Sequence, residues 1–334
     1  MIIGIIGTGF GKTIAQTFRA VDKNCGIFLC GSNKDKTKKI AAEIGVQVIE
    51  KWQDLILRPE IDLAVIATPS SLHKKMFEAI IKQNKHILLE KPAATTAQDI
   101  RDMIALSKNY SKNIIVNHEV RFNPVVSYIK NCIENNLLGD IMTLRIGAYL
   151  NLFSNESYTG TWYNRKESGG GQLLAIGVHQ IDLARFLLNM PKIEKGAIFT
   201  SVYDDPRFTE STNAESQFSG NLITEKGTCV ELFNDSYCFG GKDFIIEVIG
   251  SRGIIKYSDT QGLRVSFAND QPLEEIQLED SMPDIKIGNS ILTKSLKFFV
   301  KELIEMIEKN KANDRFCSLQ VAADNLEIIE KYKD

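Results

Sequence analysis

One histidine stands where an acid or a base could act. His179 lies in GGGQLLAIGVHQID, residues 169–182, and is one of only four histidines in the chain. An imidazole has a reference pKa of ~6.5, so it can accept a hydroxyl proton near neutral pH. Three glycines precede it and would let the backbone approach a ligand closely. His179 is therefore a candidate catalytic and substrate-binding residue, and the alternative is a histidine packed in the core.

Helical spacing predicts which side chains accompany His179. If residues 173–188 form a helix, positions 172, 175, 179, 182 and 186 share one face. That face carries Gln172, Ala175, Asp182 and Phe186 beside the histidine. Asp182 lies one turn later and could orient the imidazole. It could equally serve a structural pairing, for instance with Arg185.

A glycine-rich turn at the start of the chain predicts a dinucleotide site. GIIGTGFGKTIAQTF places Gly7, Gly9 and Gly11 between a strand and a helix, where a pyrophosphate needs a tight turn and free N–H groups. The third position of the G-x-G-x-x-G pattern is Lys12, so we expect strand and helix to pack less closely there, with the lysine able to reach phosphate. The expected cofactor-binding residues of this turn are Gly7, Thr8, Gly9, Phe10, Gly11 and Lys12.

The end of the second strand bears on the choice of dinucleotide. An acidic residue there binds the ribose 2′-OH of NAD. In LCGSNKDKTKK that place is held by Ser32 and Asn33, with Lys34 and Lys36 nearby, whereas Asp35 comes late. A hydroxyl and two lysines can hold a 2′-phosphate. The sequence therefore favours NADP over NAD.

The elements that position these residues follow two rhythms. Up to about residue 118, apolar strands alternate with helices, which predicts a doubly wound parallel sheet. We expect strands at Ile2–Ile6, Gly26–Cys30, Val46–Ile49, Ile61–Ala67, His86–Glu90 and Asn113–Asn117, and helices at Lys34–Ile44, Ser71–Gln83 and Ala97–Lys108. Gly45 is placed to end the first of these helices, and Thr96 with Asp99 to cap the last.

After residue 119 an α+β pattern follows, built on an open and mainly antiparallel sheet. Helices are expected at Pro124–Asn136, Leu173–Leu188, Ser295–Asn310 and Ser318–Tyr332, and strands at Met142–Leu150, Ile193–Tyr203, Glu215–Thr224, Thr228–Asn234, Phe244–Ile249, Gly253–Tyr257 and Leu263–Phe267. We expect one domain at 1–118 and a substrate-binding and oligomerisation domain at 119–334, whose C-terminal helix could pack back on the first.

Composition excludes several classes of partner. A net charge of −2 gives no reason to expect nucleic acid or a membrane surface, and no apolar run is long enough to span a bilayer. The six cysteines have no metal-ligand spacing, so we expect no metal. Reduced thiols and the lack of a targeting segment indicate a cytoplasmic protein.

Three further segments complete a family pattern. ATPSSLH at 67–73 follows one strand, Glu90-Lys91-Pro92 ends the next, and RFNP covers 121–124. With the glycine turn and the His179 segment, in this order, the chain resembles the glucose–fructose oxidoreductase and inositol dehydrogenase family (Gfo/Idh/MocA). This resemblance implies an NAD(P)-dependent oxidoreductase acting on a hydroxyl of a sugar, cyclitol or nucleotide sugar. It also implies a homo-oligomer, a dimer or a tetramer, assembled through the open sheet.

The resemblance also assigns roles to residues. Lys91 touches the nicotinamide end and the reacting hydroxyl, where a fixed ammonium would stabilise a developing alkoxide. Cofactor contacts are implied for Thr68, Pro69, His73, Glu90, Lys91 and Pro92, with His73 structural or cofactor-facing rather than catalytic. Arg121 is either a domain-interface residue or a substrate contact. In TGTWYNRKES, Trp162 and Tyr163 offer flat surfaces for stacking on a sugar ring.

One position departs from the family pattern. The family usually has an aspartate one turn before the histidine, and here that residue is Ala175. Alanine cannot hydrogen-bond the imidazole, and in the family the aspartate also contacts substrate hydroxyls, so the resemblance alone gives no basis for an inositol-dehydrogenase-like specificity. Two alternatives stay open: a dehydrogenase or reductase of a non-sugar carbonyl or dihydrodiol, and a non-catalytic regulator that senses a dinucleotide.

Overall fold

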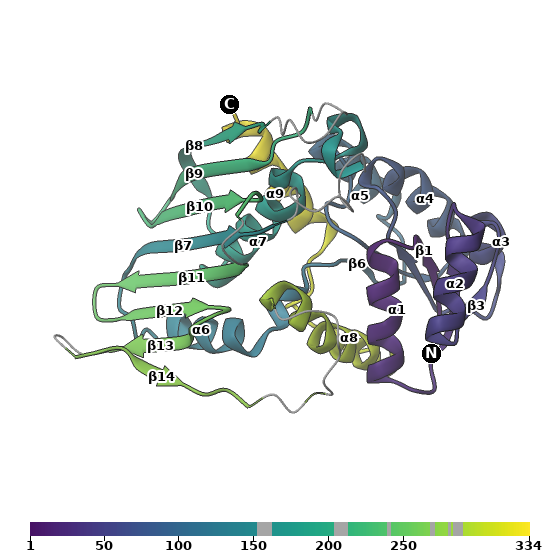
Figure 1. Cartoon of the computed structure of the whole chain (residues 1–334), viewed down its shortest axis with the longest axis horizontal. Helices are drawn as coiled ribbons and strands as arrows, with labels where there is room; N and C mark the ends of the chain where they lie inside the picture. The colour runs from purple at the N-terminus through teal and green to yellow at the C-terminus, as the bar shows by residue number, and fades with distance from the viewer. Residues whose placement is uncertain (152–161, 204–212, 239–241, 268–270, 280–281, 283–289) are drawn as a thin grey trace. The chain divides into compact units, whose positions relative to one another are not determined.

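The computed structural model describes the 334-residue chain except for residues 152–161, 204–212, 239–241, 268–270, 280–281 and 283–289. It divides into two compact units. The first comprises Met1–Glu119 and Lys294–Asp324, and the second contains most of 120–279 and ends with Asn325–Asp334. Each unit has its own sheet, as the two rhythms of the sequence predict (Figure 1).

The sheet of the first unit is parallel throughout. Its order is β3-β2-β1-β4-β5-β6, with β1 at Ile2–Ile6, β2 at Gly26–Cys30, β3 at Gln47–Val48, β4 at Leu63–Ile66, β5 at His86–Leu89 and β6 at Ile114–Val116. The order reverses direction at β1 and β4, because β2 and β3 lie on one side of β1 and the later strands on the other. Such a switch point is where doubly wound sheets bind ligands, at the carboxyl ends of the strands.

Helices alternate with these strands. They are α1 (Phe10–Val21), α2 (Lys34–Ile44), α3 (Trp52–Leu57), α4 (His73–Ile80) and α5 (Ala97–Leu106), and most of α8 (Ile291–Lys309) belongs to the same unit. The caps follow the sequence: Gly45 ends α2 at φ 73°, and Thr96 Oγ1 accepts the N–H of Asp99 at 3.1 Å. α3 was not expected from the sequence. Among the helices that the structure describes, none is both long and apolar enough to cross a membrane.

The sheet of the second unit is mixed, not wholly antiparallel. Its order is β14-β13-β12-β11-β7-β10-β9-β8. The strands are β7 (Ile141–Tyr149), β8 (Ile193–Ser201), β9 (Gln217–Thr224), β10 (Cys229–Asp235), β11 (Asp243–Gly250), β12 (Ile254–Ser258), β13 (Gly262–Ser266) and β14 (Glu274–Ile276). Only the β10–β7 pair is parallel among these neighbours. The expectation of a mainly antiparallel sheet is confirmed.

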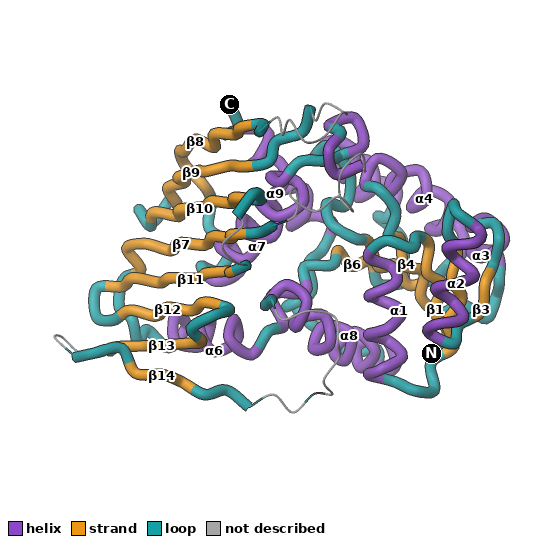
Figure 2. The backbone as a smooth tube through the Cα atoms, viewed as in Figure 1, coloured by secondary structure: helices purple, strands orange, loops and turns teal. Residues whose placement is uncertain are grey.

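One face of this sheet packs against helices. Alternating residues such as Leu144, Ile146 and Leu232 are fully buried, and α7 (Val178–Leu187) lies against β7 and β10 (Figure 2). α6 (Pro124–Glu134) packs beside α7, and α9 (Leu319–Tyr332) ends within this unit. The expected helix over 173–188 is in fact two elements, because a π-helical turn, η6 (Leu173–Gly177), precedes α7.

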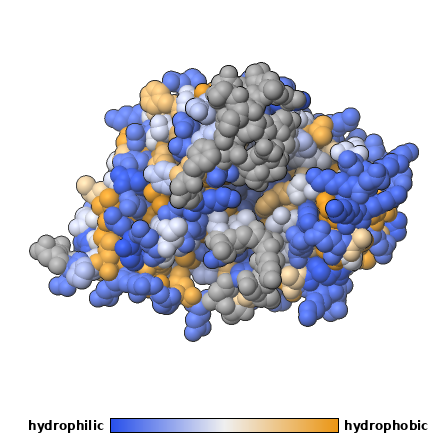
Figure 3. Space-filling view, viewed as in Figure 1, coloured by the Kyte–Doolittle hydropathy of each residue, from blue (hydrophilic) through white to orange (hydrophobic). Residues whose placement is uncertain are grey.

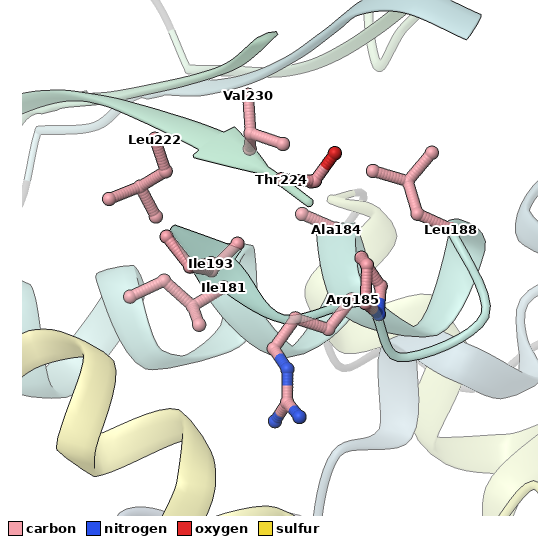
Figure 4. Close-up of a pocket in the computed structure, with 9 residues that line it drawn as sticks. Ile181, Ala184, Arg185, Leu188, Ile193, Leu222, Thr224 and Val230 are labelled. Atoms are coloured by element: carbon pink, nitrogen blue, oxygen red, sulfur yellow. The ribbon is translucent and has the colours of Figure 1, made fainter. Parts of the chain in front are cut away.

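The packing of α7 on the sheet is close. A cavity of only about 10 Å³ lies between Ile181 of α7 and the strand residues Leu222 and Val230 (Figure 4). This volume is at the lower limit for one water molecule. The guanidinium of Arg185 points away from these apolar side chains. This side of α7 is therefore a packed core and no ligand site.

Candidate active site

The glycine turn at the switch point leaves room where a pyrophosphate would need it. Gly7 has φ 119°, and a Cβ there would lie 2.1 Å from the carbonyl oxygen of Ala67, so only glycine fits. A Cβ at Gly9 would meet nothing within 4 Å. Gly9 also begins α1 without any side-chain cap, which leaves the first N–H groups of the helix to a ligand. This cradle fits a dinucleotide phosphate.

Gly11, one residue before the third motif position, is the glycine that lets α1 pack closely on β1. A Cβ at Gly11 would lie 3.1 Å from Ile5 and 3.4 Å from Ala67, so Gly11 does the work assigned to the third motif position. The looser packing expected at Lys12 itself stays a prediction. The Lys12 ammonium pairs with Glu43 of α2 at 2.9 Å, and its expected contact with phosphate stays a prediction.

The end of β2 is less positive than the sequence suggests. Asn33 is occupied as the cap of α2, where its side chain accepts the N–H of Lys36 at 2.9 Å. Lys34 pairs with Glu50 at 2.7 Å, and both side chains are exposed. Ser32 is exposed, at the carboxyl end of the strand. Glu50 thus brings a carboxylate to an edge where the sequence shows none in β2 itself.

His73 ties together the loops that follow β4 and β5. Its Nε2 lies 2.8 Å from the Thr68 carbonyl oxygen and its Nδ1 lies 3.1 Å from that of Pro92. The ring is buried, and burial lowers the pKa of His73 more than these two carbonyls raise it. His73 therefore joins the two loops, and its expected role toward the cofactor stays a prediction. Beside it, Ser70 is buried and its Oγ has no partner among the described residues, so a ligand could satisfy it.

Lys91 follows β5 at a place where burial favours the neutral form of its amine. Its side chain is half-buried, and burial lowers the pKa of Lys91, while the carboxylates of Glu119 and Glu90 act against this shift. Burial raises the pKa of Glu90 to about 7, although Asn117 Nδ2 donates to Glu90 Oε1 at 2.6 Å. An amine and a carboxyl with displaced pKa values at the end of a strand are typical of acid–base sites.

His179 lies at the start of α7, directly after the π turn. The N–H of Val178 donates to the carbonyl of Leu173, five residues back, which defines that turn. His179 is 4% exposed and Ala175 5% exposed. The extra residue in the turn changes the helical register, so the face expected at α-helical spacing holds only from residue 178 onward.

Asp182 serves a structural pairing, with a different partner from the one suggested. Its carboxylate accepts Arg121 Nε at 2.7 Å and Nη2 at 2.5 Å, and also Asn325 Nδ2 at 2.8 Å. Arg185 Nη1 donates to Asn325 Oδ1 at 2.6 Å. Arg121 is 1% exposed and its guanidinium donates to Asp182, so it has a structural partner, and the substrate contact expected as its alternative role stays a prediction.

The aromatic pair before the glycines is present and half-buried. Trp162 and Tyr163 stack on each other with ring centroids 4.0 Å apart, so one face of each ring is already covered by the other. A Cβ at Gly170 would lie 2.4 Å from the Trp162 carbonyl oxygen, which explains the glycine. The start of TGTWYNRKES, residues 159–161, lies outside the described residues.

Two buried polar residues near this helix were not predicted from the sequence. Glu215, just before β9, is 2% exposed and contacts the π turn. Asn234 of β10 is buried, and its Nδ2 lies 3.4 Å from Gln172 Oε1. A carboxylate or amide at an inward position of an apolar strand pattern was the only available signal.

Comparisons with known proteins agree with both units. A family model described as "Oxidoreductase family, NAD-binding Rossmann fold" matches residues 1–118, and one described as "Oxidoreductase family, C-terminal alpha/beta domain" matches residues 130–330. The chain is 27% identical to levoglucosan dehydrogenase of Pseudarthrobacter phenanthrenivorans, over 80% of this chain and 77% of that protein. It is 24% identical to myo-inositol 2-dehydrogenase of Thermotoga maritima, over 81% and 79%.

A solved structure has the same fold. Levoglucosan dehydrogenase in complex with NADH and levoglucosan superposes with a TM-score of 0.88 at 20% identity, covering 99% of this chain and 96% of that one.

Proposed function

Because the chain belongs to the Gfo/Idh/MocA family of oxidoreductases, we propose that it oxidises or reduces a hydroxyl-bearing carbon of a sugar or cyclitol with a nicotinamide dinucleotide. The observation that carries this proposal is Lys91, half-buried after β5 with its pKa lowered and two carboxylates acting on it. The named substrates of relatives support the class, since they include levoglucosan, myo-inositol and 1,5-anhydro-D-fructose.

The residues divide the work as follows. A bound dinucleotide supplies or accepts the hydride. The N–H groups at the start of α1 bind its pyrophosphate, with Gly9 leaving space for it. Lys91 donates a hydrogen bond to the reacting oxygen and stabilises negative charge on it. His179 takes the hydroxyl proton in the oxidative direction and returns it in the reductive one.

Supporting residues keep these groups in place. His73 holds the loop that carries Lys91 through the Pro92 carbonyl. Trp162 and Tyr163 offer aromatic surface to a sugar. Arg121 holds the Asp182 carboxylate in place.

The choice of dinucleotide belongs to the same proposal. The lack of an acid in β2 favours NADP(H), whereas Glu50 beside Lys34 works against a 2′-phosphate. The family description names NAD, and we propose NAD(H) as the working cofactor with NADP(H) as the alternative. Comparing kcat/KM for the two cofactors tests this.

The assay follows cofactor absorbance with a panel that includes levoglucosan, myo-inositol and 1,5-anhydro-D-fructose. Lys91→Ala and His179→Ala are expected to lower kcat by about 10²–10⁴-fold. Lys82→Ala, at an exposed lysine, is the matched control and keeps wild-type turnover. Wild-type turnover in both active-site variants would refute these roles.

Two alternatives have distinct outcomes in that assay. Turnover of small keto compounds or dihydrodiols, with none of the polyols, would assign the protein to a non-sugar substrate. Tight cofactor binding with no turnover of any compound would favour a dinucleotide-sensing regulator, for which Ala175 is the supporting feature.

The open face of the second sheet supports the proposal of a homo-oligomer. We also propose that the enzyme is cytoplasmic. Met142, Tyr149 and Phe199 are 57%, 42% and 55% exposed on strands β7 and β8, and Figure 3 shows apolar residues among the polar ones over this sheet. Light scattering on the purified protein tests this, and a monomer at micromolar concentration would contradict it.

A further inference from the structure

We propose that Glu215 is a positioning residue for His179, acting through the π turn at the start of the helix. The role rests on the proposed function only in so far as His179 moves a proton. Glu215 Oε1 accepts the N–H of Leu173 at 3.2 Å, and the Glu215 carbonyl oxygen accepts the N–H of Gln172 at 2.9 Å. One residue thus binds two successive N–H groups that the helix start cannot pair internally.

Gly171 makes this contact possible. A Cβ at Gly171 would lie 2.5 Å from the Glu215 carboxyl carbon, and its φ is 103°. Because the third glycine of the GGG run has no side chain, the Glu215 carboxylate can lie directly beside its Cα. The Gly171 carbonyl then accepts the N–H of Ala175 at 3.0 Å, so the same residue joins the carboxylate to the turn.

The carboxylate is fixed from the sheet side as well. The N–H of Ser216 donates to the Ser201 carbonyl at 3.0 Å, which ties the residue after Glu215 to β8. Lys333 Nζ lies 3.6 Å from Glu215 Oε2. The Lys333 backbone is held on β8 too, because Ile198 and Lys333 form a parallel bridge and the N–H of Asp334 donates to Ile198. A buried anion thus has a cation and two fixed backbone attachments.

The consequence for His179 follows from helix geometry. Each residue turns an α-helix by about 100°, so one residue gained or lost in the turn at 173–177 would swing His179 to another face. A carboxylate at a helix N-terminus is also stabilised by the N–H groups it faces. Glu215 therefore selects the register in which His179 is presented.

Histidine NMR tests this without any substrate. The chain has four histidines, and His73, His86 and His118 belong to the first unit, so they serve as internal references. Comparison with His179→Gln assigns the His179 signal. In Glu215→Ala this signal is expected to move or broaden while the three references stay. In Glu215→Gln, which still accepts the Leu173 N–H, it is expected to stay close to wild type.

Kinetics provide the second measurement, on the full-length protein. Glu215→Ala is expected to lower kcat on the order of 10²-fold with the cofactor Kd unchanged, because a misplacement of about 1 Å costs that much. Glu215→Gln is expected to recover most of it. Lys333→Met should cause a smaller loss that vanishes in the Glu215→Gln background, and Lys331→Met on the same tail is the control.

The outcomes separate the two proposals. An unmoved His179 signal in Glu215→Ala overturns the inference, as does a Lys333→Met loss that persists in the Glu215→Gln background. If Glu215→Ala does not fold, the inference is tested by comparing the effect of Lys333→Met in the wild-type and in the Glu215→Gln backgrounds. A His179 signal that moves as expected, in a protein whose wild type turns over no compound, supports the positioning and refutes the proposed function.

Discussion

Arg121 and Asp182, which are 61 positions apart in the sequence, form a buried bidentate ion pair. Nε and Nη2 of the arginine lie 2.7 Å and 2.5 Å from the two carboxylate oxygens, and both side chains are 2% exposed. Asn325 completes the pairing of the aspartate. Asp182 is one helical turn beyond His179, so this pair holds the middle of the helix whose start Glu215 holds.

Removing one member of this pair should be costly. Asp182→Ala leaves a buried guanidinium without its anion and is expected to destabilise the second unit by about 3–5 kcal/mol. The double variant Arg121→Met/Asp182→Leu is expected to recover a large part of that loss, since no charge is left buried. Urea denaturation followed by circular dichroism measures both. Glu305→Ala, which breaks an exposed pair with Lys309, is the control and should cost about 0.5 kcal/mol or less. A loss below about 1 kcal/mol in Asp182→Ala would contradict the structure.

Gly7 and Gly9 should fail in different ways. Gly7→Ala places a Cβ 2.1 Å from a backbone oxygen at φ 119°. It is expected to destabilise the first unit by about 2 kcal/mol or more. Gly9→Ala meets no atom within 4 Å and should leave the melting temperature almost unchanged while weakening dinucleotide binding about 10-fold or more. Thermal unfolding and cofactor fluorescence titration separate the two effects. Equal cofactor affinity in Gly9→Ala and wild type would remove Gly9 from the binding site.

Glu90 should make stability depend on pH. Its folded pKa is raised to about 7 from 4.5, so the folded state holds the proton more tightly than the unfolded state. The resulting stabilisation is fully present below pH 4.5 and is lost as the pH rises through about 7. Glu90→Gln keeps an acceptor for Asn117 and removes the titration. The melting temperature of wild type should therefore fall relative to that of Glu90→Gln between pH 5 and pH 8, whereas parallel curves would show that Glu90 has an ordinary pKa.

Glu50 should influence the preference between cofactors. Glu50→Gln releases Lys34 from its ion pair and removes a negative charge from the end of β2. The ratio of kcat/KM for NADP over NAD is expected to rise about 2- to 5-fold, a range that matches an exposed ion pair. Glu60→Gln, which breaks the exposed Arg58 pair elsewhere in the unit, is the control and should leave the ratio unchanged. A ratio that does not move in Glu50→Gln would place the ribose away from this edge.

Periodicity and cap residues were enough to predict most of the architecture. The bounds of α2 and β1 match the expected ranges, and Thr96 and Gly45 act as predicted. The pattern failed where an element is short or its pairing is distant. α3 has six residues and β14 has three, too few to show a period. β10 and β7 pair in parallel although they are far apart in the sequence. No turn links them directly, so the local sequence does not predict their pairing.

The candidate site shows a similar limit. Motif residues such as Gly7 and Lys91 lie at strand ends as expected, because βα units place them there. The partners of Asp182 and Lys12 could not be predicted, since Arg121 and Glu43 come from other elements. The π turn was missed because hydrophobic spacing does not distinguish a bond to the fifth residue back from one to the fourth.

The place of β7 in its sheet has a consequence for how the chain is made. Arg145 of β7 pairs with Glu231 of β10 and Glu247 of β11, which are 86 and 102 residues further on. During synthesis, β7 must wait for most of the second unit before either neighbour exists, and contacts this distant slow folding. Ribosome-bound chains that end before β10 would therefore carry an unpaired central strand, while the first unit could already have closed its parallel sheet.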